Sequence, residues 1–219
     1  MPEQPLVSVI VCVRDGERFL DEALDSIAAQ EFTDLETIVI DDGSTDDSAH
    51  SARKHSFSPV VVSQPALGIG AAINHGIRLA RGRYLAFLDC DDVWPSDRLI
   101  AMIQAIERDL GTDYVFGSVV NTDERLNPIN TPQPARLLGS LLIKRASVDR
   151  IGAFRTDVAH AGIVDWMSRA EALGLRFEIL DRLVLLRRIH GSNLGSRDRP
   201  NARRDLLRVI RDHHRRTRS

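Results

Sequence analysis

The stretch Tyr84-Leu85-Ala86-Phe87-Leu88-Asp89-Cys90-Asp91-Asp92 is an apolar run that ends in three carboxylates within four residues. Its apolar part is short and aromatic and follows the turn residues Arg81-Gly82-Arg83, so it predicts a buried strand. In an open α/β sheet, ligands bind at the carboxyl ends of the strands, where these acids would lie. We therefore interpret the stretch as a core strand that ends in a binding site.

The spacing of the carboxylates indicates what this site binds. Asp89 and Asp91 can reach one hard cation if the backbone leaves the strand between them. Mg²⁺ or Mn²⁺ held in this way usually keeps waters and takes phosphate oxygens as further ligands, so a metal-bound phosphate is implied. The alternative is a solvated acidic turn in which Asp92 or Ser96 caps the next helix. That alternative accounts for one carboxylate but not for three.

Strand and helix patterns alternate along the first half of the chain. Apolar, β-branched runs predict strands, and apolar residues at helical spacing predict helices between them. The expected strands are 6–13, 35–40, 60–62 and 84–88, and the expected helices are 17–30, 45–54 and 70–80. Such repeated units predict an α/β fold, in which helices flank a mostly parallel sheet and a nucleotide-sized crevice lies at its carboxyl edge.

The second half departs from this rhythm after one more helix and strand. The expected elements are a helix at 96–110, a strand at 114–120, a polar loop at 121–134, an apolar segment at 137–143, helices at 146–151 and 164–173, and two short strands within 177–189 around the Asp181-Arg182 turn. A loop of that length often has a function. We expect a single domain over 1–219, in which 6–110 forms the nucleotide-binding half and 111–193 a substrate-shaping extension.

Composition narrows the class of protein. The 219 residues are 43% hydrophobic and 27% charged, with a net charge of -2, so bulk charge does not point to nucleic acid. Two cysteines provide no disulfide framework, which fits a reducing cytoplasm. Residues 1–5 lack a basic signal-peptide region, and no apolar run approaches the ~20 residues of a membrane-spanning helix. We expect a cytoplasmic protein.

Two further motifs lie at predicted strand-to-helix connections. In the segment 41–46, the carboxylate of Asp42 can accept a hydrogen bond from the imide of uracil, while Gly43 permits a tight turn. A simple strand-to-helix turn is the alternative, but it leaves the paired acids unexplained. In the segment 68–76, two glycines precede a helix that carries Asn74, as in a phosphate cradle. Ile73 replaces the third glycine of a dinucleotide fingerprint, which argues against NAD.

Taken together, these segments resemble one family, the family-2 glycosyltransferases of GT-A fold. The similarity is strong over roughly 6–110 and looser over 137–193, and it is carried in order and spacing by 7–10, 39–46, 68–76 and 80–94. The resemblance implies a nucleotide-sugar donor, usually UDP-linked, bound with Mn²⁺ or Mg²⁺ through the Asp-x-Asp motif. It also implies transfer with inversion to an acceptor that the sequence leaves open: saccharide, lipid, small metabolite or peptide.

The resemblance also implies roles for individual residues. Asp42 matches the uracil contact, Asp91 the main metal ligand, and Asp89 a contact to the metal, the ribose or the sugar. The segment 187–193 is similar to the C-terminal Arg-x-His-x-x-Asn motif of the family, which implies that His190 contacts the diphosphate or its metal. Asn74, in the segment 68–76, is assigned to the donor site as well.

The chain departs from the family after its first strand. Cys12 and Arg14 stand where a proline and an aromatic residue are frequent, and we place both at the donor site. An aromatic side chain there would stack on the base. Arg14 could stack through its guanidinium plane, pair with phosphate, or simply be exposed.

The catalytic base is the second departure from the family. Aligned through Arg169 and Gly174, the usual base position falls on Ile163, which cannot accept a proton. Asp165 is the nearest carboxylate and His160 the second candidate, although an Asp at the start of a helix can equally be an N-terminal cap. A nucleotide-sugar-binding protein with weak or no transferase activity is therefore the alternative function.

The C-terminal segment has a composition of its own. Between 197 and 218 there are nine arginines and three aspartates, with a narrow apolar stripe formed by Leu206, Leu207 and Ile210. This pattern predicts a basic amphipathic helix over 197–219, which could touch an anionic membrane surface or an acidic acceptor. We favour the alternative that the stripe docks on the domain and the charges are solvated.

Overall fold

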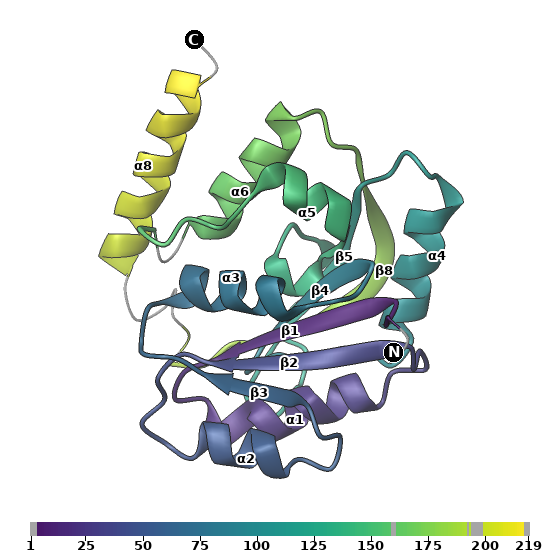
Figure 1. Ribbon diagram of the computed structural model, residues 1–219, viewed down its shortest axis with the longest axis vertical. Helices are drawn as coiled ribbons and strands as arrows, with labels where there is room; N and C mark the ends of the chain where they lie inside the picture. Colours follow the sequence, from purple (N-terminus) through teal and green to yellow (C-terminus); the bar gives the residue numbers. More distant parts are fainter. Residues whose placement is uncertain (1–3, 159–160, 192, 194–198, 217–219) are drawn as a thin grey trace.

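The computed structural model describes residues 4–158, 161–191, 193 and 199–216 (Figure 1). The strands are β1 (Val7–Val13), β2 (Leu35–Asp41), β3 (Val60–Ser63), β4 (Tyr84–Asp89), β5 (Tyr114–Thr122), β6 (Gln133–Pro134), β7 (Leu142–Lys144) and β8 (Phe177–Arg188). The helices are α1 (Glu17–Ala28), α2 (Ser48–Lys54), α3 (Ile69–Leu79), α4 (Arg98–Arg108), α5 (Arg145–Ile151), α6 (Gly162–Ala172) and α8 (Arg199–Arg216), with a 3-10 turn, η1 (Leu138–Ser140). The alternation expected for the first half is confirmed.

One mixed sheet organises the molecule. Its order is β3-β2-β1-β4-β7-β5-β6, and β8 pairs with β5. The first four strands of this order are mutually parallel, whereas β7 runs antiparallel to both β4 and β5. Cys12 of β1 lies in register between Ile40 and Asp89, so the carboxyl ends of β1, β2 and β4 form one edge. The predicted α/β class and mostly parallel sheet are confirmed.

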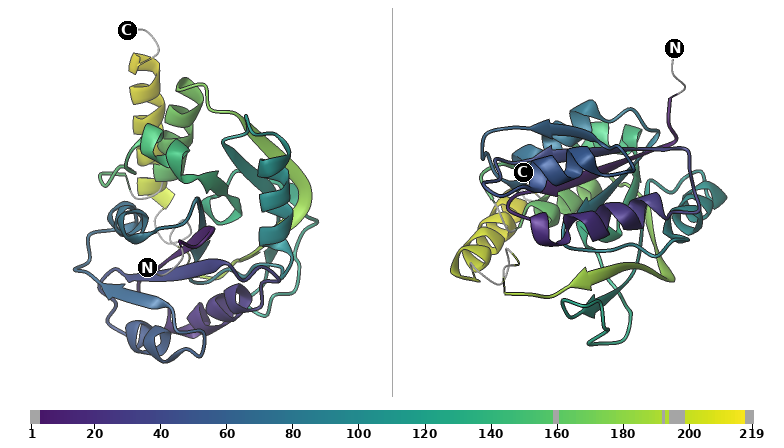
Figure 2. Two further views of the ribbon diagram at one scale, coloured as in Figure 1. Left: turned by 45° about the vertical axis from the view of Figure 1, so that its right-hand side comes forward. Right: turned by 90° about the horizontal axis from the view of Figure 1, so that it is seen from below.

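Helices cover both faces of the sheet (Figure 2). The side chains of β1 alternate between the faces: Val9 and Val11 pack in a core with α1, α2 and α4, whereas Ile10 packs in a core with α3, α5 and α6. A strand buried on both faces reads as a continuous apolar run, which is the pattern of 7–13. The two cores hold the strands rigidly, so their ends offer a fixed platform for a site.

The region 177–189 differs from its expectation of two short strands. It forms one strand, β8, which pairs in parallel with β5 through register shifts on either side of Ser118. Phe116 lies opposite Ile179, and Ser118 lies opposite Leu183, so the intervening residues are absorbed as an irregularity of the strand. The expected turn at Asp181-Arg182 is therefore wrong, because pairing with β5 overrides the local turn preference.

The C-terminal helix docks on the domain, but not through the expected stripe. In Figure 1, α8 stands at the margin of the molecule, beside α6. Val209 is 2% exposed and forms a small core with Val158 and Ala161. Leu206, Leu207 and Ile210 are instead 41%, 59% and 43% exposed. In the described part of the chain, no helix combines the length and the apolar character needed to cross a bilayer.

Candidate functional site

The three acids after β4 occupy different environments. Asp89 ends the strand, and the backbone then turns, with the amide of Asp92 donating to the carbonyl of Asp89 at 3.1 Å. The Asp92 side chain is buried and accepts a hydrogen bond of 2.8 Å from the backbone amide of Arg188. Asp89 is exposed and Asp91 is half-buried. Asp92 thus ties the turn to β8, which leaves the Asp89–Asp91 pair for a ligand.

The end of β8 brings the C-terminal motif to this pair. His190 Nε2 lies 2.9 Å from Asp91 Oδ2, and the side-chain amide of Asn193 donates to the same oxygen at 2.9 Å. The side-chain oxygen of Asn193 accepts from the backbone amide of His190 at 2.6 Å, which holds the two residues in one turn. The imidazole also packs 4.9 Å from the ring of Phe19 in α1. Asp91 is thus held in a single orientation by two side chains from a distant segment.

A buried arginine fixes the position of that segment. Arg188 is 0% exposed; its Nη2 donates to Glu22 Oε2 at 2.5 Å, and its guanidinium lies 4.3 Å from the ring centre of Phe19. These contacts join the end of β8 to α1, so the 188–193 turn is anchored to the core. A buried cation that pairs with its partner in one geometry limits how the segment can move.

Burial and the repulsion between neighbouring carboxylates both disfavour charge in the acidic turn. Burial, followed by the charge of Asp91, raises the pKa of Asp89 to about 6. Burial and the charges of Asp89 and Asp91 also raise the pKa of Asp92 well above its ordinary value. Protein atoms crowd the Asp89 carboxylate even though part of its surface reaches solvent. A cation placed between Asp89 and Asp91 would relieve this repulsion.

The side chains of the acidic turn fit an open magnesium or manganese site, completed by ligand phosphates and water, better than a closed structural metal site. Across 4–158, 161–191, 193 and 199–216 there is no cluster of three or more His, Cys, Asp or Glu side chains arranged to hold a metal by themselves. Mg²⁺ usually binds through one or two carboxylates together with substrate phosphates and waters, and therefore needs no protein cage. Asp89 and Asp91, with His190 beside them, supply such a partial set.

Asp42 lies near this edge and organises the loop after β3. Its Oδ1 accepts from the side-chain amide of Gln64 at 2.8 Å and from the backbone amide of Leu67 at 2.9 Å, and its Oδ2 accepts from the amide of Gly68 at 2.8 Å. A carboxylate offers about four acceptor positions, so one position on Oδ2 is left for a further donor. Asp42 therefore shapes the loop and keeps one hydrogen-bond acceptor position that a nucleobase could use.

The tight turn expected at Gly43 is confirmed. Its φ is 75°, and a Cβ at this position would lie 2.8 Å from the backbone nitrogen of Ala66. The helix that follows begins at Ser48 rather than at 45, because Asp46 bonds to the 15–17 loop and to Ser48 instead of extending the helix. The loops after β1 and β2 are thereby joined into one wall of the edge.

The remaining donor-site candidates divide into two groups. Cys12 and Arg14 lie at the carboxyl end of β1, and burial raises the pKa of the Cys12 thiol, which keeps it neutral. Arg14 is exposed there. Asn74 is instead used within the fold: its amide nitrogen donates to the carbonyl of Phe154, and its oxygen accepts from the amide of Phe154, at 2.9 and 2.8 Å. The structure thus brings Asn74 to the 154–155 loop rather than to the acidic pair.

The two base candidates cannot be treated alike. His160 lies outside the described residues. Asp165 is 1% exposed, with Arg169 Nε donating to its Oδ2 at 2.9 Å and Arg155 Nη1 lying 3.7 Å from its Oδ1. It does not cap α6 through its side chain, since the N-terminal cap position is Ala161. Asp165 is thus a buried carboxylate paired with two arginines, and a proton placed on it would weaken both ion pairs.

Comparison with known families decides what kind of chain carries this edge. The model of the family described as "Glycosyl transferase family 2" matches residues 8–166. The chain belongs to glycosyltransferase family 2. The match spans the sheet edge with Asp42, Asp89 and Asp91 and extends to the start of α6.

Individual relatives place this family 2 chain among larger proteins. It is 34% identical over 129 residues to the chondroitin synthase of Escherichia coli, covering 58% of this chain and 19% of that protein. It is 38% identical over 91 residues to the uncharacterized glycosyltransferase EpsJ of Bacillus subtilis (strain 168), covering 40% and 26%. The chain therefore spans well under half the length of these curated relatives.

Solved structures confirm the GT-A fold. TarS of S. aureus (residues 1–349) superposes with a TM-score of 0.76 at 21% identity, covering 94% of this chain and 64% of that one. The mannosyltransferase PcManGT of Pyrobaculum calidifontis, in complex with GDP-Man and Mn²⁺, superposes with a TM-score of 0.75 at 21% identity, covering 98% and 65%. At these identities the likeness concerns the fold alone.

Several residues at this edge of the sheet received no individual role from the sequence. Asn193 and Arg188 stood inside the recognised C-terminal motif, so the motif itself was the signal that could have marked them. Glu22 and Phe19 carried no such signal. They read as surface and core residues of an amphipathic helix, and only the packing of β8 against α1 gives them a role.

Proposed function

We propose that this chain is a metal-dependent glycosyltransferase that transfers a sugar from a nucleotide diphospho-sugar, UDP-linked, to an acceptor hydroxyl with inversion. The observation that carries the proposal is the meeting of Asp89, Asp91, His190 and Asn193 at the carboxyl edge of the sheet. These residues come from segments about a hundred positions apart, and a merely structural turn would not need two accessible, mutually repelling carboxylates.

Each residue at the edge has a role in this proposal. Asp89 and Asp91 would hold Mn²⁺ or Mg²⁺, which neutralises the charge that develops on the leaving diphosphate. His190 lies within reach of the same diphosphate because it contacts Asp91. Asp42 would accept from the uracil imide through Oδ2, while Gln64 and Leu67 hold its other oxygen. Cys12 and Arg14 would border the base at the end of β1.

The solved relatives support a nucleotide-sugar donor but do not decide which nucleobase the donor carries. TarS has been crystallised with UDP and with UDP-GlcNAc, whereas PcManGT was crystallised with GDP-Man and Mn²⁺. The uracil assignment therefore depends on Asp42. The acceptor stays open among saccharides, lipids, small metabolites and peptides, and a cytoplasmic location stays a prediction from cysteine usage.

One observation favours a second function. The usual base position is Ile163, and Asp165, the nearest carboxylate, is held between Arg155 and Arg169. A chain that binds the donor but lacks a base would be a nucleotide-sugar-binding protein with weak or no transferase activity. In the transferase proposal, Asp165 or His160 accepts the proton of the acceptor hydroxyl.

A thermal-shift panel tests the donor assignment. UDP, GDP, dTDP and NAD are each added with and without Mn²⁺, since a ligand that binds only the folded state must stabilise it. We expect the largest rise in melting temperature with UDP and Mn²⁺ together and no Mn²⁺-dependent rise in Asp91→Asn. A shift with GDP but none with UDP would disprove the uracil assignment.

Transfer itself is measured as UDP release from UDP-sugars in the presence of candidate acceptors. Asp165→Asn and His160→Ala are compared, because loss of the base should lower turnover by at least ~100-fold with donor affinity kept. Donor binding without release in the unmodified protein, across all acceptor classes, would favour the binding-protein alternative.

A further inference from the structure

The outer face of α8 combines apolar and cationic side chains in a way that its docking does not explain. Residues 203, 207, 210 and 211 recur at helical spacing and therefore share one side of the helix. Leu207 and Ile210 supply the apolar part, 59% and 43% exposed, and Arg203 and Arg211 the charge. We call the surface formed by Arg203, Arg204, Leu206, Leu207, Ile210 and Arg211 the α8 outer face.

The orientation of this face is set by contacts on the opposite side of the helix. Val209 is buried against the domain, Asp212 accepts from Arg155 at 2.8 Å, and the ring of His213 lies 2.5 Å from the hydroxyl of Ser168. An apolar contact, an ion pair and a polar contact on one side leave little freedom to rotate the helix. The outer face is therefore presented to solvent by the fold.

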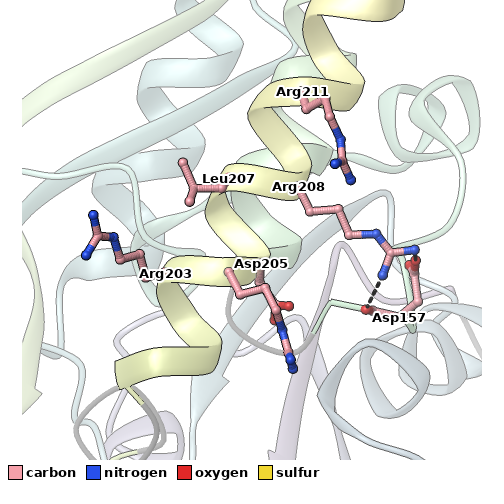
Figure 3. A pocket seen from close by; sticks show the side chains of 7 residues that line it. Asp157, Arg203, Asp205, Leu207, Arg208 and Arg211 are labelled. Carbon is pink, nitrogen blue, oxygen red and sulfur yellow. Dashed lines mark hydrogen bonds and ion pairs between the residues drawn. The ribbon is translucent and has the colours of Figure 1, made fainter.

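The charge on the exposed side is strongly unbalanced. Figure 3 looks onto the exposed side of α8, where Arg203 and Leu207 lie along one margin of this side and Arg208 and Arg211 along the other. A hollow on this side measures about 630 Å³ and is lined by Asp157, Arg203, Arg204, Asp205, Leu207, Arg208 and Arg211. Asp157 is already paired with Arg155 and Arg208, and Asp205 is largely buried. The arginines thus dominate the field that a ligand at this surface meets.

We propose that the α8 outer face docks on an anionic lipid bilayer. Phosphate groups of the lipids would meet Arg203, Arg204 and Arg211, and the side chains of Leu207 and Ile210 would enter the boundary between headgroups and acyl chains. A bilayer satisfies both halves of the surface, because it offers anions and an apolar phase within a few ångströms of each other. Long arginine side chains can keep their charge at the headgroups while their stems lie along apolar surface.

The position of α8 in the chain links this surface to the donor edge. Asn193, which contacts Asp91, precedes the first residue of α8 by only six positions. Docking through α8 would therefore hold the carboxyl edge of the sheet close to the membrane. This proposal concerns binding alone and does not depend on the proposed transferase function.

Sedimentation of the full chain with lipid vesicles tests the proposal. We expect binding to phosphatidylcholine vesicles that contain about 30 mol % phosphatidylglycerol and weak binding to pure phosphatidylcholine, because the electrostatic attraction comes from the anionic lipids. Raising NaCl from about 0.1 M to about 1 M should release the protein, since it shortens the Debye length from about 10 to 3 Å.

Two variants separate the contributions of charge and apolar contact. The triple variant Arg203→Gln, Arg204→Gln, Arg211→Gln should lower the partition coefficient by about 100-fold, at about fivefold for each arginine near an anionic surface. Leu207→Gln with Ile210→Gln should weaken binding by at least about tenfold, because the insertion of apolar area is lost.

Matched controls remove the same groups elsewhere on the surface. Arg83→Gln, Arg108→Gln, Arg125→Gln removes three exposed arginines outside α8, and Leu110→Gln with Ile129→Gln removes two exposed apolar side chains. Both controls should bind vesicles nearly as well as the unmodified chain. Melting temperatures confirm that every variant is folded.

Three results would overturn the proposal. The first is vesicle binding that does not depend on phosphatidylglycerol, and the second is equal loss of binding in the α8 triple variant and its control. The third is the absence of binding to the anionic vesicles; if light scattering then shows a dimer of the unmodified chain and a monomer of the α8 triple variant, the face is an oligomer interface instead.

Discussion

Asn193 and Asp91 are 102 positions apart, and the amide of Asn193 donates a hydrogen bond of 2.9 Å to the Asp91 carboxylate. With His190 on the same oxygen, this contact sets the direction in which the other Asp91 oxygen faces. Asn193 would therefore orient the carboxylate that we propose as a metal ligand, and this role can be tested.

Replacing Asn193 should therefore weaken metal-supported donor binding. Asn193→Ala removes the donor to Asp91 without removing a proposed ligand, and loss of such an outer contact typically lowers metal affinity by about tenfold or more. Calorimetric titration with UDP should show the loss with Mn²⁺ present and little change without it. Gln104→Ala, an exposed amide in α4, is the matched control. Equal affinities in Asn193→Ala and the unmodified protein would show that Asp91 needs no orientation.

The raised pKa of Asp89 predicts a pH dependence of the metal-free protein. Because the pKa is about 6 in the folded chain and near 3.8 when unfolded, protonation of Asp89 favours the folded state. That stabilisation is complete below about pH 4 and is lost as the pH rises through about 6. Asp92, whose pKa burial also raises, acts in the same direction.

The measurement is a comparison of melting temperatures at about pH 5 and pH 7.5. We expect Asp89→Asn to raise the melting temperature of the metal-free protein at the higher pH and to change it less at the lower pH. Mn²⁺ should stabilise the unmodified protein more at the higher pH, where both carboxylates are charged. The same Asp89→Asn effect at both values would contradict the raised pKa.

Asp42 should have both a structural and a binding effect. Asp42→Asn replaces one carboxylate oxygen by an NH2 group, so that the amide of Leu67 or of Gly68 loses its acceptor, and we expect the free energy of unfolding to fall by about 1–3 kcal/mol. If Asp42 also contacts uracil, the variant should lose affinity for UDP and keep its affinity for pyrophosphate. Equal losses for the two ligands would indicate that Asp42 only shapes the loop.

Asp165 should contribute to stability. Asp165→Asn leaves Arg169 without its carboxylate partner, whereas Arg155 keeps Asp157 and Asp212, so we expect the free energy of unfolding to fall by about 1–3 kcal/mol. Urea unfolding measures the loss. Asp149→Asn, an exposed acid on α5, should change stability by no more than about 0.5 kcal/mol. If the two variants are equally stable, the ion pairs of Asp165 do not stabilise the fold. That result would favour the role of Asp165 as the catalytic base.

The expectations that proved correct depended on local sequence, and those that proved wrong were decided by tertiary contacts. The strand 84–89 and the helix 98–108 could be predicted because their periodicity is local. The turn at Asp181-Arg182 could not, because β5 supplies hydrogen-bond partners that extend β8 through it. The expectation that Leu206, Leu207 and Ile210 dock on the domain was wrong, because a basic helix with scattered apolar residues has two faces that could dock. Val209 and the Asp212–Arg155 pair select one of them.

By itself the sequence determined the α/β class, the acidic strand end and the order of motifs that marks family 2, because each depends on residues close together in the chain. Tertiary structure alone decided that His190 and Asn193 meet Asp91. It also decided that Asn74 bonds to the backbone of Phe154 and that Asp165 pairs with Arg155 and Arg169. Those contacts depend on how β8, α1 and α6 pack, and packing is settled by the summed burial of many side chains rather than by any one motif.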